Sequence, residues 1–356
     1  MTSLGAPEGR PAPRAEGEVE VAMPQVAVLG TGGTIATVEH AEGASLRTCA
    51  ELLAEVSGLE QIAAVRCSEV LRLPSQLMGQ AEMAQVAQSA VEHARSPAVD
   101  GVVVLHGTDV LEETLFLTDL WHTGQTPIVF TGAQRSAGHP APDGPANILD
   151  AVTVASSAEA RGLGAVVCLG GTVQAASRAA KRDTASLDPF HGDAPPLGQV
   201  SGGRFRPAGV PGRRSRDASL RPRALEHRVE LVRLASACDG ALLRAASELG
   251  ASGLVVEAFG AGTAPKDVVA AVEELVAGGI VVLLASRCDR GGVWRQDGPW
   301  ASERIVQAGA LPVGRLEGSK ARIALLAALA EADGDGARAA DLVRTWLDEA
   351  GWSSGW

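Results

Sequence analysis

The sequence predicts an α/β protein, with a larger N-terminal domain on a mainly parallel sheet and a smaller C-terminal α/β domain. Two observations lead to this prediction. From Pro24 onward, short apolar runs rich in β-branched residues alternate with longer helical patterns, which is typical of βαβ units. A stretch rich in Gly, Pro and Arg at residues 192–228 interrupts the alternation, and a second alternating series follows it. At 356 residues, the chain is long enough for two domains.

We therefore divide the chain into four parts. Residues 1–23 are rich in Pro, Gly and Glu and lack an apolar segment, so we expect a disordered tail and not a secretory signal. Residues 24–200 should form the N-terminal domain, and residues 201–228 should link it to the next one. Residues 229–356 should form the C-terminal domain.

The expected strands are continuous apolar runs, as strands buried on both faces of a sheet should be. In the N-terminal domain they are residues 25–29, 101–105, 127–130 and 165–169, with helices at 79–95 and 110–122. In the C-terminal domain, strands at 229–234, 253–259 and 280–286 alternate with helices near 239–249, 265–277, 318–332 and 338–349.

Composition excludes several classes of function. The formal net charge is −11, and no segment outside residues 204–228 is dense in Lys or Arg, which argues against binding to nucleic acid. No apolar run approaches the roughly 18 residues of a membrane span, so we expect no membrane association. The 5 cysteines form no CxxC pair, which predicts neither a zinc site nor a disulfide framework. We therefore expect a reduced, cytoplasmic protein. Lysine occurs only at positions 181, 266 and 320 of the sequence.

Four turns rich in Gly and Thr follow the strands of the N-terminal half. The carboxyl ends of parallel strands share one edge of the sheet, where such proteins bind ligands. We therefore expect the site at this carboxyl edge, lined by the turns at residues 30–34, 106–109, 131–134 and 170–172.

The first turn, GTGGTIA at residues 30–36, invites comparison with a dinucleotide-binding loop. A GxGxxG/A pattern that starts at Gly30 needs Gly or Ala at position 35, where Ile35 stands, so the pattern gives little support for a nucleotide cofactor. Two interpretations remain open. Thr34 either caps a tight strand-to-helix turn or offers its hydroxyl to a ligand that the glycines let approach.

The turn at residues 106–109 also has two interpretations. Asp109 with Glu112 three residues later fits a helix capping box. Alternatively, Thr108 and Asp109 face the crevice at a helix start, where anions are stabilised. His106 follows the strand directly, and a structural imidazole is the simpler expectation for it.

Taken together, these turns resemble the bacterial L-asparaginase family, of the asparaginase/glutaminase type. Order and spacing both fit from about Gln25 to the C-terminal helices, where KAR at 320–322 resembles the start of a family helix. The segments that carry the resemblance are TGGTIA (31–36), PSQLM (74–78), HGTDVLEET (106–114), DGPAN (143–147) and the lysine after GGTV, Lys181.

The resemblance implies that the chain hydrolyses the side-chain amide of L-asparagine to L-aspartate and ammonia, with no metal and no cofactor. The catalytic residues it implies are Thr34 as nucleophile, a second threonine Thr108, the carboxylate Asp109 and the base Lys181. The substrate-binding residues it implies are Gly33, Ser75, Gln76, Thr108 and Asp109. Family members are typically tetramers, and the turn at residues 260–263 matches the segment that reaches across to a neighbour, so we expect a homodimer or homotetramer.

The chain departs from the family in one conspicuous way. Family members commonly carry a tyrosine in the loop after TGGTIA, and this chain contains no tyrosine. Its loop at residues 37–48 offers Ser45, Arg47 and Thr48 instead. Two alternatives therefore stay open: an asparaginase-like protein that binds a small amino acid or assists assembly with little activity, and an amidase on glutamine or another amide. The acidic net charge counts against a tRNA-dependent amidotransferase.

Overall fold

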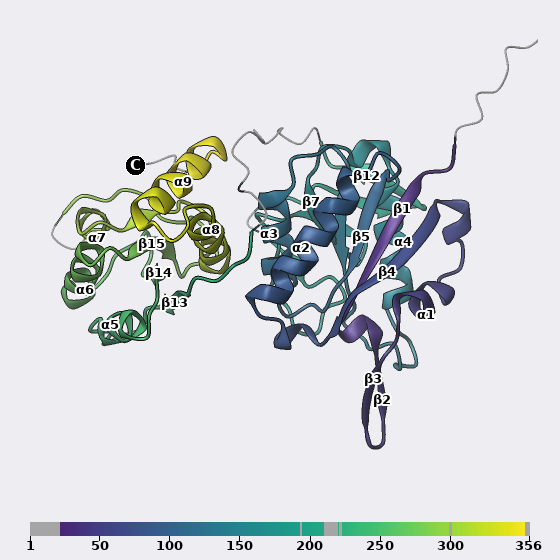
Figure 1. Cartoon of the computed structure of the whole chain (residues 1–356), viewed down its shortest axis with the longest axis horizontal. Helices are drawn as coiled ribbons and strands as arrows, with labels where there is room; N and C mark the ends of the chain where they lie inside the picture. The colour runs from purple at the N-terminus through teal and green to yellow at the C-terminus, as the bar shows by residue number, and fades with distance from the viewer. Residues whose placement is uncertain (1–21, 193, 210–219, 221–222, 299–300, 353–356) are drawn as a thin grey trace, which may run out of the picture.

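The computed structural model describes residues 22–192, 194–209, 220, 223–298 and 301–352. Within these ranges the chain forms two α/β domains, coloured purple to teal and green to yellow in Figure 1. Most of the expected tail lies outside the described residues, as do parts of the expected linker. No helix in the described ranges is long and apolar enough to cross a bilayer.

The N-terminal domain is built on an eight-stranded sheet with the order β12-β11-β8-β7-β6-β5-β1-β4. Strands β4, β1, β5, β6 and β7 run parallel, and β8, β11 and β12 continue the sheet in antiparallel fashion. The prediction of a mainly parallel sheet is therefore confirmed. The strands are β1 (Gln25–Gly32), β4 (Ala64–Leu73), β5 (Gly101–Leu105), β6 (Ile128–Thr131), β7 (Ala165–Leu169), β8 (Thr172–Ala175), β11 (Gly198–Ser201) and β12 (Arg204–Pro207).

Two parts of this sheet differ from the expectation. The edge strand β4 was not anticipated, because its sequence AVRCSEVLRL is largely exposed and shows no continuous apolar run. The sheet also extends beyond residue 200, where the linker was expected to begin. Its last two strands are joined by Gly202 and Gly203, both with positive φ (60° and 69°), so a stretch that reads as a glycine-rich linker is a tight hairpin turn.

Helices cover both faces of the sheet because alternate residues of each buried strand point to opposite sides. Val102 and Val104 of β5 pack with α2 and α3, whereas Val103 and Leu105 pack with α1 and α4. The helices are α1 (Cys49–Ala54), α2 (Gln80–Arg95), α3 (Leu111–Trp121) and α4 (Gly144–Ala155), with 3-10 turns at Thr34–Ala36, Leu59–Gln61, Ser75–Leu77 and Ala158–Ala160.

Two small antiparallel pairs lie outside the main sheet. The hairpin of β2 (Thr37–His40) and β3 (Gly43–Leu46) projects from the N-terminal domain (Figure 1). The pair of β9 (Ala180–Lys181) and β10 (Phe190–His191) carries Lys181.

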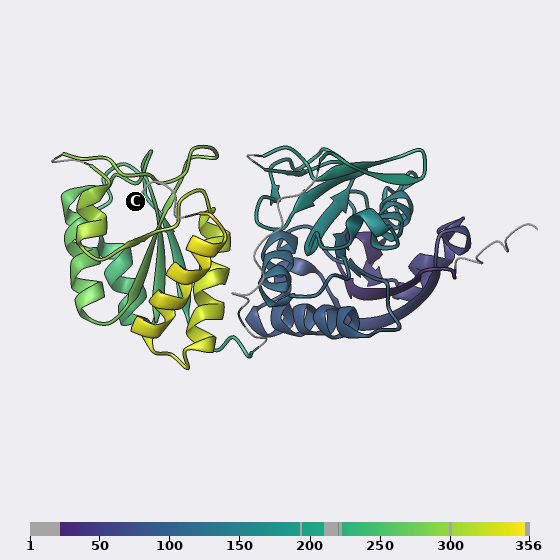
Figure 2. The ribbon, with the colours of Figure 1, turned by 90° about the horizontal axis from the view of Figure 1, so that it is seen from above.

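The C-terminal domain has a four-stranded parallel sheet in the order β13-β14-β15-β16. Helices again flank both faces, with α8 and α9 on one side and α5 and α6 on the other (Figure 2). The strands are β13 (Val229–Arg233), β14 (Gly253–Ala258), β15 (Val281–Ser286) and β16 (Leu311–Pro312). The helices are α5 (Ala241–Glu248), α6 (Lys266–Ala277), α7 (Glu303–Gln307), α8 (Gly318–Glu331) and α9 (Gly336–Glu349).

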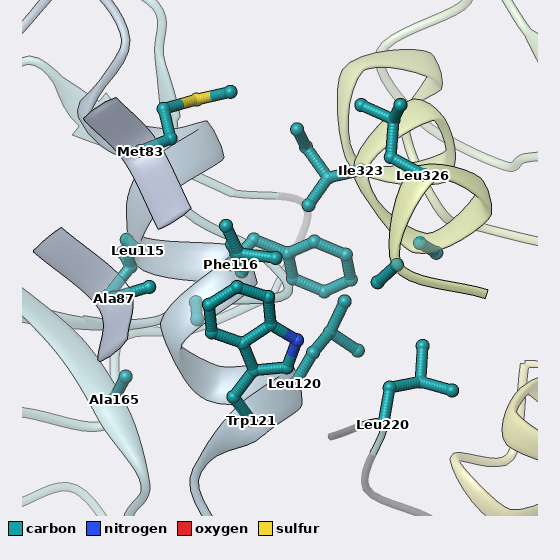
Figure 3. Close-up of a cluster of buried hydrophobic side chains, with 14 of the residues drawn as sticks. Met83, Ala87, Leu115, Phe116, Leu120, Trp121, Ala165, Leu220, Ile323 and Leu326 are labelled. Atoms are coloured by element: carbon teal, nitrogen blue, oxygen red, sulfur yellow. The ribbon is translucent and has the colours of Figure 1, made fainter. Parts of the chain in front are cut away.

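The two domains share one hydrophobic cluster. Figure 3 shows Phe116 and Leu120 of α3 facing Ile323 and Leu326 of α8. Phe116 also meets the ring of Trp346 edge to face, with centroids 5.8 Å apart. Because burial of these side chains requires both domains, the cluster fixes α8 against α3.

We expect Phe116→Ala to lower the free energy of unfolding by about 3–5 kcal/mol, since it removes a fully buried ring from this shared cluster. Leu242→Ala is the control, because Leu242 is 68% exposed and should change stability by no more than about 0.5 kcal/mol. Urea unfolding followed by tryptophan fluorescence measures both. Equal unfolding midpoints for the two variants would contradict a structural role of the cluster.

Candidate active site

The site begins where β1 and β5 end side by side. Gly30 pairs with Leu105 in the sheet, so the turns that follow these residues start at the same level. Gly33 packs directly on Gly107: a Cβ on Gly33 would lie 2.3 Å from the Gly107 Cα atom. The φ of Gly33 is also positive, at 83°. Glycine is therefore required at position 33 on two grounds, space and backbone conformation.

Ser75 joins these two turns from the end of the neighbouring strand β4. It is 2% exposed, and its Oγ accepts a hydrogen bond of 3.2 Å from the backbone N–H of Asp109. Gly107 leaves room for this contact, because a Cβ there would lie 2.5 Å from Ser75 Oγ. The next residue, Gln76, is exposed. Three strand ends thus bring Gly33, Ser75 and Asp109 together.

Lys181 completes the arrangement from β9. Its Nζ donates a hydrogen bond of 2.8 Å to Thr108 Oγ1 and forms an ion pair of 3.0 Å with Asp109 Oδ1. Thr108 is buried, whereas the Asp109 side chain is 55% exposed. The site therefore presents a hydroxyl paired with an amine and a carboxylate that a solvent-borne ligand can reach.

The capping interpretation of Asp109 is wrong. Helix α3 begins at Leu111, its N-cap is Val110, and no side chain caps it. Helix α3 begins one residue later than a capping box at Asp109 requires, and the Asp109 carboxylate pairs with Lys181 instead. The crevice-facing interpretation describes this residue.

Thr34 lies next to this cluster but makes no hydrogen bond with it. Gly33 is the N-cap of the 3-10 turn at Thr34–Ala36, so Thr34 is not the cap. Its side chain is half-buried, and within the described residues its hydroxyl has no hydrogen-bond partner. The structure thus brings Thr108, Asp109 and Lys181 into direct contact, and it leaves the Thr34 hydroxyl available.

The loop hydroxyls expected as substitutes for a tyrosine are occupied elsewhere. Thr48 is the N-cap of α1 and forms a capping box with Glu51. Ser45 lies on the projecting hairpin, where its Oγ hydrogen-bonds to His40 Nε2 at 2.8 Å. Arg47 forms an ion pair with Glu55. These three side chains therefore serve local structure in this conformation.

The other two turns are braced by Asn147 of the DGPAN segment. Its Nδ2 donates to the Gly132 carbonyl at 3.0 Å, and its Oδ1 accepts from the Gly170 N–H at 3.2 Å. Thr172 donates its hydroxyl to Asp188 Oδ2 at 2.9 Å. These turns support the carboxyl edge, and the sequence had given no separate role to Asn147.

Glu112 is a site residue that the sequence interpretation missed. Its Oε2 accepts the backbone N–H of Lys181 at 2.7 Å, and its Oε1 accepts the hydroxyl of Ser319 at 3.2 Å. The only available signal was its position in the HGTDVLEET segment, where a helix cap explained it equally well. No group of three or more His, Cys, Asp or Glu side chains in the described part of the chain could hold a metal ion.

His106 is buried as a structural imidazole would be, but in the ranges that the structure describes only one of its two ring nitrogens has a partner, whereas we expected both to be satisfied. It is fully buried, and its Nδ1 donates to the Gly107 carbonyl at 2.7 Å. Among the described residues, its Nε2 has no hydrogen-bond partner. Burial lowers the pKa of His106 to about 4, although the hydrogen bond to Gly107 opposes the shift.

Comparisons with known proteins place this chain among enzymes that hydrolyse linear amides. Residues 25–209 match the family model described as "Asparaginase, N-terminal". Residues 228–342 match the "Glutaminase/Asparaginase C-terminal domain". The chain therefore belongs to the asparaginase family, and the resemblance inferred from the sequence motifs is confirmed.

Individual relatives agree with this assignment. A "Probable L-asparaginase" of Deinococcus radiodurans is 34% identical over 316 residues, which cover 86% of this chain and 93% of the relative. A "Glutaminase-asparaginase" of Pseudomonas fluorescens biotype A is 30% identical over 290 residues, or 78% of this chain and 79% of the relative. The crystal structure of a "Probable Cytoplasmic L-asparaginase" from Campylobacter jejuni has a TM-score of 0.80 at 25% identity and covers 90% of this chain and 99% of its own.

The low pKa of His106 predicts a pH dependence of stability. The imidazole is neutral in the folded protein down to about pH 4 but takes up a proton below about pH 6.5 when unfolded. Stability should therefore fall as the pH drops from 6.5 towards 4, with a contribution from this group of about 3 kcal/mol. Urea unfolding of the wild type and of His106→Gln across this range measures it. Parallel profiles for the two proteins would rule out the contribution.

Proposed function

We propose that this chain hydrolyses the side-chain amide of L-asparagine to L-aspartate and ammonia by threonine-nucleophile catalysis. The observation that carries the proposal is the 2.8 Å contact between Lys181 Nζ and Thr108 Oγ1, next to the exposed carboxylate of Asp109. Membership of the asparaginase family gives this constellation its chemical meaning.

A small zwitterion fits the charges of the site. The Asp109 carboxylate would receive the substrate's α-ammonium group, which would then compete with Lys181 for it. Ser75 lies beside Asp109, and the family resemblance makes Ser75, Gln76 and Gly33 the residues that would hold the α-carboxylate. Ligand binding would leave Thr108 as the remaining partner of the Lys181 amine.

The reaction would proceed in two steps, acylation of Thr34 and hydrolysis of the resulting ester. Thr34 Oγ1 adds to the amide carbon, and its proton reaches the leaving nitrogen through the Thr108–Lys181 pair, so that ammonia departs and a β-aspartyl ester remains. A water molecule then adds to the ester, and L-aspartate and free Thr34 result. Backbone N–H groups of the glycine turns would stabilise the oxyanion at each stage, at about 3–4 kcal/mol for a good donor.

Because the chain contains no tyrosine, the proton of Thr34 has to be transferred through the pair formed by Thr108 and Lys181 in this proposal. Ser45 and Thr48 have local hydrogen-bond partners, which leaves the Thr108–Lys181 pair as the proton relay that this proposal uses. Glutamine is the second candidate substrate, since the Pseudomonas fluorescens relative is named for both amides. Relatives named as enzymes favour catalysis over the alternative of a binding protein.

We expect Thr34→Ala, Thr108→Val and Lys181→Met each to lower kcat by at least about 100-fold, the scale of losing a nucleophile or its base. Ammonia release from asparagine, glutamine and simple amides measures this, and Ser45→Ala on the exposed hairpin is the control that should retain activity. Wild-type rates in all three variants would refute the assignment. If wild-type protein binds asparagine in calorimetry but releases no ammonia at saturation, the binding-protein alternative holds.

The same proposal includes a homodimer or homotetramer in the cytoplasm. Asp109 and Gln76 are exposed in the single chain, whereas amide hydrolysis benefits from exclusion of water, so a second copy would close the site with the turn at residues 260–263. The cytoplasmic location draws on the description of the Campylobacter jejuni structure.

We expect light scattering at micromolar concentration to show a dimer or tetramer, and dilution into monomer should abolish activity. A fully active monomer would contradict closure of the site by a second copy.

A further inference from the structure

The strand that carries Lys181 has few backbone partners of its own. Strand β9 consists of Ala180–Lys181, and it pairs on one side with the equally short β10. On the other side, the backbone N–H of Lys181 donates to Glu112 Oε2 at 2.7 Å. The position of the Lys181 amine therefore depends on a side chain from the start of α3.

Glu112 is held in turn by the C-terminal domain. Its second carboxylate oxygen accepts the hydroxyl of Ser319, in the first turn of α8, at 3.2 Å. One carboxylate thus bridges β9 of the N-terminal domain and α8 of the C-terminal domain. With both oxygens engaged, the side chain has little freedom to move.

Arg182, the residue after Lys181, makes a second connection to the same region. Its guanidinium pairs with Asp289 at 3.1 Å and with Glu317 immediately before α8. Glu317 also binds the Nζ of Lys320 at 2.9 Å, and the Lys320 side chain is completely buried. Separating this pair would leave the buried Lys320 charge without a partner, so Glu317 is held in the position where it binds Arg182.

We propose that Glu112 is a positioning residue through which the C-terminal domain holds Lys181 at its distance from Thr108. This inference rests on the proposed function, in which Lys181 acts on Thr108. A displacement of about 1 Å at a reacting group can cost on the order of 100-fold in rate, so loss of this support should affect turnover more than substrate binding.

The chain offers a matched control in the adjacent residue. Glu113 also connects the two domains, through an ion pair with Arg322 at 3.2 Å, and Arg322 also donates to the Val229 carbonyl. Among the described residues, neither Glu113 nor Arg322 forms a hydrogen bond or ion pair with β9. Loss of the Glu113 pair weakens the same domain interface without touching Lys181.

The experiment compares Glu112→Ala, Glu112→Gln and Glu113→Ala in ammonia release, with Lys181→Met as the reference for the proposed function. In Glu112→Ala, kcat should fall by about 10- to 100-fold while KM stays within about threefold. Glu112→Gln should keep kcat within about threefold, because its amide oxygen still accepts the Lys181 N–H and its amide nitrogen can donate to Ser319. Glu113→Ala should retain kcat, although its melting temperature falls as far as that of Glu112→Ala.

Each other outcome decides against the inference. Equal kcat losses in Glu112→Ala and Glu113→Ala would show a general weakening of the interface, and an equal loss in Glu112→Gln would show an effect of charge instead of position. Should Glu112→Ala fail to fold, Ser319→Ala replaces it: a fewfold drop in kcat at constant KM supports positioning, and wild-type kcat opposes it. If the Lys181→Met variant is active, the proposed role of Lys181 is refuted. If Lys181→Met is inactive but the Glu112→Ala variant keeps the kcat of the wild type, only the positioning role of Glu112 is refuted.

Discussion

The close approach of Gly33 and Gly107 is the constraint on which the rest of the site depends. Backbone meets backbone there, with no room for even a methyl group. Because such a contact involves no side-chain rotamers, it sets the separation of the two turns with little tolerance. Thr34 follows Gly33 and Thr108 follows Gly107, so this contact also sets the positions of the two threonines. Ser75 packs against Gly107 and adds the end of β4 to the site.

Much of the fold and part of the site could be predicted from the sequence. Central strands buried on both faces must be continuously apolar, so β5 and β7 were predicted with the bounds that the structure gives. Parallel strands end at one edge, and that rule brings the turn of Gly33 next to the turn of Gly107. Ser75 was expected at the site only from the family resemblance, because strand β4 that carries it to this edge was not anticipated. The parallel topology of the sheet is what brings turns from distant parts of the sequence to one edge.

The remaining features depend on contacts that no local pattern encodes. Glu112 satisfies a capping box on paper, and only the fold reveals that its carboxylate serves Lys181, 69 positions away, and Ser319 of the other domain. The exposed edge strand β4 lacks the apolar run of a buried strand, and the antiparallel hairpin after β8 looks like a linker because two glycines form its turn. In each case, a partner distant in sequence decides what the residues do.

The scarcity of lysine has a practical consequence for chemical labelling. Of the three lysine side chains, Lys320 is completely buried and Lys181 is engaged in the site and only 22% exposed, whereas Lys266 stands in solvent at the start of α6. Amine-directed reagents should therefore modify Lys266 before any other side chain. A dye or polymer attached through a lysine side chain would therefore be fixed at a defined point on the C-terminal domain, away from the Lys181 amine.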